Sequence, residues 1–349
     1  MTHRLRALGL AAALATLATA APAVAQTTTL RVGNWLPPHH LIIKGIVEPW
    51  AQAIERESNG TLKLEIMPSA VGRPPEYFDF TVNGVVDIGY GVSGHNPGRF
   101  TLTQVMDLPF MAPDPWAGAA AAWLTYERYG ARYGEHKGAK VLGLWVHSEP
   151  YIFMRGEPLR TLDDLKGKKI RVGGNVTGRI IQALGGAPVQ LPPTEAQQAM
   201  ASGVADGITF PQESIEFFKI TPVIKGATRI PGGLYTDTFW LAINEAKWNA
   251  LTPAQKAAFE RHSGPAVALL SGWAWTNGDL WGRAALDRNG VVFATISDAD
   301  VEKAKVALKP LEDEWLAEAA KRSLPGPEII AYARTMADKY RASKRVNVP

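Results

Sequence analysis

Arg171 is the residue whose place in the sequence most clearly requires a chemical partner. It lies in GKKIRVGGN, residues 167–175, where Ile170 and Val172 favour a β-strand and two glycines end the run. A cation buried in such a strand is costly unless an anion accompanies it, and no carboxylate stands beside it in the sequence. The pattern therefore predicts an anion for Arg171, either a distant Asp or Glu of this chain or an external ligand.

Motifs of catalysis are missing from the sequence. It contains no Gly-x-Ser-x-Gly elbow, no His-Glu-x-x-His pair, no P-loop and no cysteine. The adjacent His39 and His40 direct their side chains apart and make a weak metal site. The glycine-rich stretches GHNPG and VGGN lack the spacing of a dinucleotide fingerprint. We therefore expect a binding protein and not an enzyme, with neither a cofactor nor a metal.

The N-terminal segment predicts export. Residues 1–25 begin with Arg4 and Arg6, continue as an Ala/Leu run and end in Ala-Val-Ala, the pattern of a signal peptide cleaved before Gln26. Because there is no cysteine, we expect neither a lipid anchor nor disulfides. Removal of the leader lowers the formal charge from +4 to +2, and no basic stripe remains, so nucleic acid is not an expected partner.

The mature chain alternates strand and helix patterns, which predicts α/β domains with largely parallel sheets. Helices are expected at 42–57, 76–83, 161–167 with Thr161 as N-cap, 176–186, 192–203 and 298–322. Strands are expected at 29–35, 60–68, 86–92, 138–147, 168–172, 187–191, 204–210 and 236–244. The region after residue 244 is expected to be mostly helical.

Two segments of the chain resemble each other. Residues 74–91 and 192–210 both begin with Pro-Pro, continue with an acidic residue and a helix pattern, and enter a strand through Gly-Val-x-Asp. A chance match is one explanation. The other is a pair of similar α/β lobes, which would form a ligand cleft at the carboxyl ends of their strands.

Several motifs together resemble the DctP-type substrate-binding proteins of TRAP (tripartite ATP-independent periplasmic) transporters. They are PPEYFDFTVNGVVDIGYG…NPGRFTLTQVMDLPF, TLDDLKGKKIRV, GVADG and LAINEAKWNAL, in the order of the family and over nearly the whole mature chain. The resemblance implies a two-lobed α/β fold of the type II-like periplasmic binding proteins, with crossing strands and a long C-terminal bracing helix. It predicts lobe I at 26–148 and 237–285, and lobe II with the C-terminal helices at 149–236 and 286–349.

The same resemblance implies a function. Such proteins are periplasmic receptors that bind a small organic acid and present it to a TRAP permease driven by an ion gradient, so we expect a periplasmic monomer with these partners. An ABC-type periplasmic receptor shares the two-lobe arrangement but not these motifs. A secreted enzyme acting on an organic acid would need a general base, for which Glu76, His39 and His95 are candidates.

Arg171 occupies the position of the arginine that binds the ligand carboxylate in this family. Its guanidinium matches a carboxylate with two parallel N–H groups. Two polar positions of relatives are aromatic here: Tyr151 stands where a second arginine is often found, and Phe210 where an asparagine is common. A second ligand carboxylate would be buried unpaired, so the sequence favours a monocarboxylate, either an aromatic acid or a 2-oxo or hydroxy acid. Replacement cations for the missing arginine would be Arg155, Arg99 or Arg73.

Two further polar residues are candidates for ligand contact. Asn175 follows the Arg171 strand, where it either binds the carboxylate or caps the next helix. Glu76 opens the first repeat helix, where it either accepts a ligand hydroxyl or complements the helix dipole.

Aromatic residues complete the predicted site. Trp35 and Tyr90 lie near the carboxyl ends of first-lobe strands, where a cleft would be. Trp240 follows the second crossing between the lobes and either lines the cleft or packs in the core. His95, in the GHNPG loop, is the remaining candidate.

Overall fold

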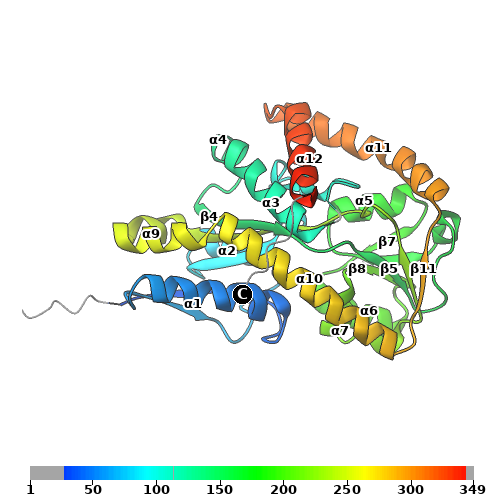
Figure 1. Ribbon diagram of the computed structural model, residues 1–349, viewed down its shortest axis with the longest axis horizontal. Helices are drawn as coiled ribbons and strands as arrows, with labels where there is room; N and C mark the ends of the chain where they lie inside the picture. The colour runs from blue at the N-terminus through cyan, green and yellow to red at the C-terminus, as the bar shows by residue number, and fades with distance from the viewer. Residues whose placement is uncertain (1–26, 113, 343–349) are drawn as a thin grey trace, which may run out of the picture.

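The chain folds into two α/β lobes, each built on its own sheet (Figure 1). The structure is a computed structural model that describes residues 27–112 and 114–342. The predicted signal peptide, residues 1–25, lies outside the described residues. None of the helices in the described part of the chain is long and apolar enough to cross a membrane.

The first sheet has the strand order β2-β1-β3-β10-β4. Its strands are β1 (Thr28–Val32), β2 (Leu62–Ile66), β3 (Ile88–Val92), β4 (Ala139–Val146) and β10 (Thr238–Asn244). β1 pairs in parallel with β2 and β3, whereas β10 is antiparallel to both β3 and β4. The carboxyl ends of the parallel strands therefore meet at one edge of this sheet.

The second sheet has the order β11-β9-β5-β8-β6-β7. Its strands are β5 (Tyr151–Met154), β6 (Lys169–Val172), β7 (Ala187–Gln190), β8 (Gly207–Phe210), β9 (Gly226–Arg229) and β11 (Val292–Thr295). β6 is parallel to both of its neighbours, β7 and β8. The sequence predicted neither β5, β9 nor β11, because each has only four residues and little apolar alternation; their pairing partners come from distant parts of the chain.

The two repeat segments have the same local structure. Each begins with a short 3-10 turn, Pro74–Glu76 or Pro193–Glu195, continues as α2 (Tyr77–Val82) or α6 (Ala196–Ser202), and then enters β3 or β8. A glycine with positive φ follows each helix, Gly84 at 74° and Gly203 at 78°. Glycine adopts this left-handed backbone without a steric penalty, so the helix can end and the strand begin within a few residues.

Four connections join the lobes in the described part of the chain, the last of them between α11 (Asp298–Lys321) and α12 (Gly326–Ala342). β4 of the first sheet runs directly into β5 of the second, and β9 returns to β10. The third is α10 (Pro265–Arg288), which contacts β4 and α3 (Pro115–Thr125) in the first lobe and α7 (Gln212–Phe217) in the second. A methyl group on Gly282 would lie 2.5 Å from the backbone nitrogen of Glu213, so glycine lets α7 approach α10 closely.

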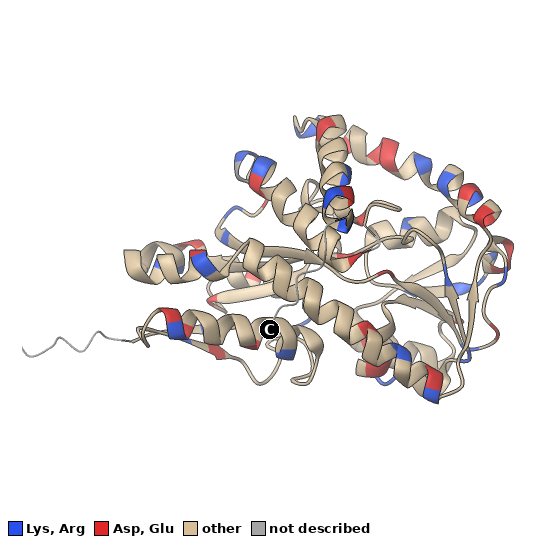
Figure 2. Cartoon of the chain, in the orientation of Figure 1, with Lys and Arg blue, Asp and Glu red and all other residues tan. Residues whose placement is uncertain are grey.

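The C-terminal helices lie along the top of Figure 1. α11 (Asp298–Lys321) contacts α5 (Asn175–Ala183) of the second lobe, and α12 (Gly326–Ala342) contacts α3 of the first. Basic and acidic residues alternate along α11 and form several ion pairs three or four residues apart (Figure 2). The remaining helices are α1 (Glu48–Glu57), preceded by a π-helical turn at Ile42–Val47, α4 (Ala131–Tyr133), α8 (Glu245–Ala250) and α9 (Pro253–His262).

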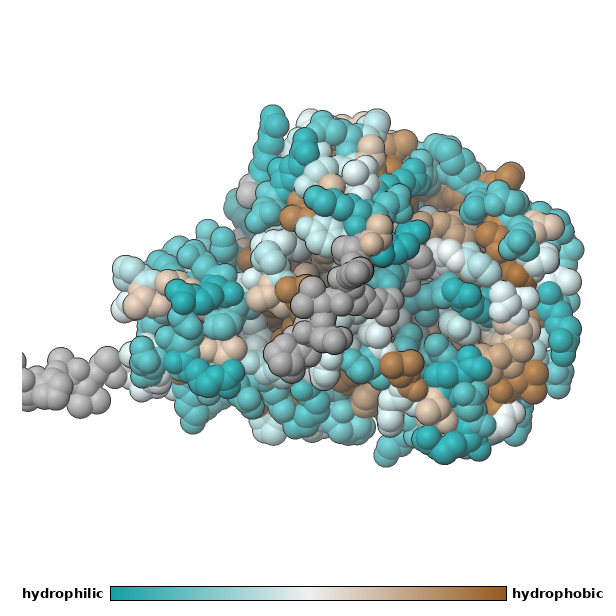
Figure 3. All heavy atoms as spheres, in the orientation of Figure 1, coloured by the Kyte–Doolittle hydropathy of each residue, from teal (hydrophilic) through white to brown (hydrophobic). Residues whose placement is uncertain are grey.

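The core is larger in the first lobe than in the second. Trp50, Trp145 and Trp240 are all buried in the first lobe, in one continuous cluster. The second lobe has two smaller clusters, on opposite faces of its sheet. The face of the molecule seen in Figure 3 is mostly hydrophilic, and its apolar atoms gather over the second lobe.

Candidate functional site

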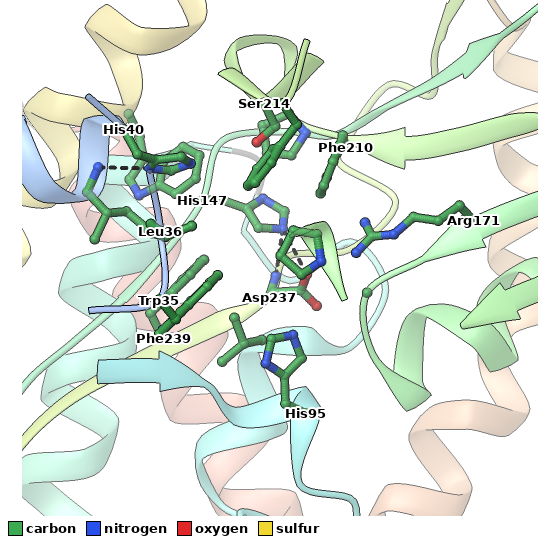
Figure 4. Close-up of a pocket in the computed structure, with 17 residues that line it drawn as sticks. Trp35, Leu36, His40, His95, His147, Arg171, Phe210, Ser214, Asp237 and Phe239 are labelled. Carbon is green, nitrogen blue, oxygen red and sulfur yellow. Dashed lines mark hydrogen bonds and ion pairs between the residues drawn. The ribbon is translucent and has the colours of Figure 1, made fainter. Parts of the chain in front are cut away.

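A cavity with a free volume of about 40 Å³ lies between the two lobes and the segments that cross between them (Figure 4). This volume is smaller than that of typical ligand sites, so a bound molecule would require the lobes or the lining side chains to move apart. Its aromatic lining consists of Trp35, Phe210, Phe218, Phe239 and Trp275. Its polar lining consists of His40, His95, His147, Arg171, Ser214 and Asp237.

The fold holds the Arg171 guanidinium in one orientation. Arg171 lies on β6, which is paired on both sides, so its backbone is fixed. Its Nε and Nη2 atoms donate to the carbonyl oxygen of Leu191 at 3.0 and 2.6 Å. The ring of Phe210 lies beneath the guanidinium, with 4.4 Å between the ring centroid and Cζ. These contacts use one side of the guanidinium and leave the other side facing the cavity.

The free side of Arg171 needs an anion. The side chain is buried, and Nη1 has no hydrogen-bond partner among the described residues. Burial lowers the pKa of Arg171 to about 10, which still leaves it positively charged at neutral pH. No ion pair within 4.0 Å joins it to a carboxylate in the described part of the chain. An anion in the cavity would satisfy both the charge and the unpaired N–H.

The two cavity histidines with shifted pKa values add no positive charge at neutral pH. Burial lowers the pKa of His40 to about 3, and it lowers the pKa of His95 to about 4. No lysine and no second arginine is present among the described residues that line the cavity. A fixed monocation therefore faces a largely apolar space.

A pair of carboxyl groups lies at the start of β10, beside the arginine. Asp237 donates its backbone N–H to His147 Nε2 at 2.9 Å, and its Oδ2 is 3.6 Å from the same nitrogen. Asp107 Oδ1 accepts from the backbone and the hydroxyl of Thr238 at 2.8 and 2.5 Å. Burial, followed by the charge of Asp237, raises the pKa of Asp107 well above its usual range, whereas the pKa of Asp237 lies below its ordinary value, chiefly because of His147.

Packed aromatic rings form the wall opposite Arg171. Trp35 donates its Nε1–H to the carbonyl of Tyr90 at 3.0 Å, which fixes the plane of the indole. Phe239 stacks on Trp145 with ring centroids 5.4 Å apart. Because these rings are held by the first lobe, they form a preformed apolar surface for a flat ligand.

Four of the residues predicted from the sequence line the cavity: Arg171, Phe210, Trp35 and His95. Tyr90 lies behind Trp35, with ring centroids 5.6 Å apart, and donates its hydroxyl to Asn34 Oδ1. Tyr151 is paired with Phe210 in the sheet, but its ring packs against Phe153 and Phe293.

The other three predicted residues lie outside the cavity. Trp240 is buried in the first-lobe core against Phe78 and Phe100, which is the second of the two alternatives stated for it. Asn175 begins α5 and makes no side-chain cap; its Oδ1 accepts from Gln104 at 3.4 Å beside a separate cavity. Glu76 accepts the backbone N–H of Arg73 at 2.6 Å and thereby caps its own helix.

The proposed replacement cations also lie elsewhere. Arg73 forms an ion pair with Glu195 at 2.8 Å, and Arg99 forms one with Asp79 at 2.7 Å. Arg155 lies in an open depression on the second lobe.

Sequence reasoning missed several residues of the cavity, among them His147, Asp237, Phe239 and Trp275. The first three lie where the chain crosses between the lobes, after β4 or at the start of β10. The crossing itself was the available signal, because a residue at the junction of two lobes has a high chance of facing the space between them. Trp275 lies on α10, whose path between the lobes no local pattern shows.

Comparisons with known proteins agree with this architecture. The family model of the bacterial extracellular solute-binding proteins, family 7, named DctP, matches residues 32–319. A TRAP periplasmic solute-binding protein from Bordetella bronchiseptica, solved with bound (R)-mandelate and (S)-mandelate, is 34% identical with a TM-score of 0.86, over 89% of this chain and 99% of that chain. This likeness confirms the predicted two-lobed α/β fold.

Two further solved structures are similar over nearly their whole length. A marine metagenome TRAP solute-binding protein, described as specific for aromatic acid ligands and solved with 3-hydroxybenzoate, is 30% identical with a TM-score of 0.86, over 90% of this chain and 99% of that chain. A TRAP solute-binding protein from Rhodoferax ferrireducens, solved with copurified benzoate, is 27% identical with a TM-score of 0.85, over 90% and 99%.

Proposed function

We propose that this protein, which belongs to the DctP family of bacterial extracellular solute-binding proteins, is a periplasmic receptor that binds an aromatic monocarboxylate through Arg171 and delivers it to a TRAP permease. The family and the similar structures are substrate-binding transport proteins, so no catalytic step is assigned to the cavity. The binding mode is argued from the cavity itself.

The observation that carries the proposal is the unpaired Nη1 of Arg171 in a cavity whose described lining holds no lysine and no second arginine. One carboxylate can reach the cavity side of the guanidinium while Leu191 holds the opposite side. Since the side chain is already ordered, binding an anion costs little additional side-chain entropy. A second carboxylate would find no cation in this lining and would face Asp237, so a dicarboxylate is disfavoured.

The apolar lining supports an aromatic body for the ligand. Trp35 and Phe239 of the first lobe lie across the cavity from Arg171 of the second lobe (Figure 4). A planar acid bound at Arg171 would place its ring between them, where aromatic contacts add to the burial of apolar surface. The relatives solved with mandelate, 3-hydroxybenzoate and benzoate give this ligand class independent support.

The binding proposal is tested with phenylacetate, benzoate and variants of two arginines. Isothermal titration calorimetry should show binding by the wild type, and ligand at about 100 times its Kd should stabilise the protein by about 2.7 kcal/mol. Arg171→Ala should weaken binding at least about 100-fold, because a buried carboxylate would be left without its cation. Arg171→Lys should retain part of the affinity, since an ammonium supplies the charge without the planar pair of N–H groups.

Arg155→Ala is the matched control, because it removes an exposed arginine of the same lobe far from the cavity. It should bind as the wild type does. Full binding by a folded Arg171→Ala variant would contradict the proposed role of Arg171.

Delivery to a permease is proposed on family membership. It is supported if adjacent genes encode a many-span permease and a four-span partner, and if uptake of the acid by that pair requires this protein. Uptake coupled to ATP hydrolysis would contradict it.

A further inference from the structure

We propose that Asp237 accepts a hydrogen bond from a ligand hydroxyl on the carbon next to the carboxylate, so that the preferred ligands are aromatic 2-hydroxy acids. This inference rests on the proposed function, because it assumes that Arg171 binds the carboxylate. It assigns a specificity-determining role to a residue that lies at the first position before β10.

Asp237 and Arg171 face the same small space beside Gly173. A methyl group placed on Gly173 would lie 3.4 Å from Asp237 Oδ2 and 3.7 Å from Arg171 Nη2. The two side chains do not form an ion pair within 4.0 Å, and Figure 4 shows both directed into the cavity. A group of two or three atoms can therefore lie between them and contact both.

The Asp237 carboxylate has acceptor capacity that the protein does not use. Its side chain is 16% exposed, and its Oδ2 lies 3.6 Å from His147 Nε2, which is longer than an ordinary hydrogen bond. His147 Nε2, the nearest nitrogen, already accepts the backbone N–H of Asp237. Burial works against ionisation of Asp237, yet its pKa lies below the ordinary value, chiefly because of the neighbouring His147 and then through His95 and the Arg171 cation. Closure around a ligand removes water from this carboxylate, which then requires a donor.

The donor that fits is a hydroxyl group. A ligand carboxylate in this position would be repelled by Asp237. An ammonium carries three donors and needs three acceptors, whereas Asp237 is the one carboxylate among the described residues that line the cavity. A hydroxyl needs a single acceptor, and a charged acceptor makes the stronger hydrogen bond.

The position of the hydroxyl follows from the short distance between the two groups. Arg171 and Asp237 both lie within 4 Å of one point beside Gly173. A carboxylate at Arg171 and a hydroxyl at Asp237 must therefore be close in the ligand, as they are on adjacent carbons of a 2-hydroxy acid. The aromatic group on the same carbon would then extend toward Trp35 and Phe239.

The test compares mandelate with phenylacetate, which differs only by lacking the 2-hydroxyl. Calorimetry should show that the wild type binds one mandelate enantiomer about 10- to 100-fold more tightly than phenylacetate, the range expected of one hydrogen bond to a charged group. In Asp237→Ala this preference should fall below about threefold. The same variant should bind phenylacetate at least as tightly as the wild type, because a negative charge beside the ligand carboxylate is removed.

Controls separate this role from a structural one. Asp313→Ala, which removes an exposed carboxylate of α11, should keep the wild-type preference. Asp237→Asn retains an acceptor oxygen without the charge and should keep part of the preference; it also replaces Asp237→Ala if that variant does not fold.

Three outcomes would overturn the inference. The first is equal affinity of the wild type for mandelate and phenylacetate. The second is an equal loss of affinity for these two acids in the folded Asp237 variants, and the third is tighter binding of phenylglycine than of mandelate. The first leaves the proposed function intact as long as binding still depends on Arg171. Failure of the wild type to bind any of these acids would overturn the proposed function as well.

Discussion

The two lobes contribute different things to the cavity. The second lobe supplies the charge: Arg171 is fixed on β6 by the carbonyl of Leu191 and by the ring of Phe210. The first lobe supplies apolar surface through Trp35 and Phe239, although both lobes contain the same helix-strand repeat. Under the proposed binding mode, the lobes would perform separate tasks, with the second lobe holding the anion and the first selecting the body attached to it.

The repeat itself shows how similar segments diverge in use. Glu76 and Glu195 stand at equivalent positions, at the end of the 3-10 turn in each repeat. Both contact Arg73: Glu76 accepts its backbone N–H, whereas Glu195 of the other lobe binds its guanidinium at 2.8 Å. The same repeat position thus has two uses. Glu76 caps a helix within the first lobe, whereas Glu195 of the second lobe forms an ion pair with the first lobe.

A substitution in the aromatic wall should affect selectivity more than anion binding. Trp35→Leu should weaken phenylacetate binding about tenfold, because a preformed ring contact is lost, and weaken 4-methylpentanoate binding less than about threefold. Arg171→Lys should weaken both acids to the same extent. Competition calorimetry with the two acids measures both effects. If Trp35→Leu lost the same affinity for phenylacetate and for 4-methylpentanoate, the first lobe would not select the body of the ligand.

The contact between α10 and α7, where the lobes are joined, should be sensitive to pH. Burial raises the pKa of Asp279 to about 7, and Asp279 Oδ1 accepts the backbone N–H of Glu213 at 3.3 Å. Between about pH 4 and pH 7, the Asp279 carboxyl is ionised in the unfolded chain but protonated in the folded protein. The contribution of Asp279 to the free energy of unfolding therefore falls as the pH rises. Relative to the wild type, Asp279→Asn should gain about 2.5 kcal/mol in free energy of unfolding from pH 5 to pH 8.

Urea unfolding at several pH values measures this difference. The comparison with the wild type is needed because burial lowers the pKa values of His40, His95 and His136, whose contributions to stability change with pH in the opposite direction. Asp287→Asn, an exposed position on the same helix, is the control. A pH-independent difference between Asp279→Asn and the wild type would contradict the assigned pKa shift.

The smallest expected effect concerns the ion pair between the lobes. Arg73 and Glu195 are both exposed, so their contact is worth at most about 1 kcal/mol, and Arg73→Ala should weaken ligand binding about two- to fivefold by faster dissociation. The effect should shrink at high salt. Arg99→Ala breaks an equally exposed pair within the first lobe and should leave dissociation unchanged. Identical dissociation rates for Arg73→Ala and the wild type would show that the pair does not hold the lobes together.

The sequence predicts the strands and helices well where the pattern is long and periodic, and it predicts Arg171 because a lone cation in a strand is conspicuous. It does not predict which neighbour on a strand faces the ligand. The sequence leaves cleft lining and core packing open for Trp240; in the structure Trp240 packs in the core, whereas Phe239, one residue earlier, lines the cavity. Adjacent strand residues point to opposite faces, and the assignment of faces depends on which lobe packs where.

The same limit explains why the sequence does not predict that Asp237 and His147 line the cavity. Neither belongs to a local motif, and each acquires its place because a crossing segment returns to the cavity from a distant part of the chain. The position of Tyr151 also depends on tertiary packing: its partner in the sheet, Phe210, faces Arg171, whereas the Tyr151 ring packs against Phe153 and Phe293. Contacts of this kind depend on the tertiary arrangement and leave no trace in nearby sequence.

A crystal structure of the wild-type protein with phenylacetate tests the central claim most directly. The account predicts the carboxylate within hydrogen-bonding distance of Arg171 Nη1, the Leu191 contact preserved, and the ring between Trp35 and Phe239. A carboxylate bound elsewhere in the cavity, with Arg171 paired to a carboxylate of the protein, would contradict it.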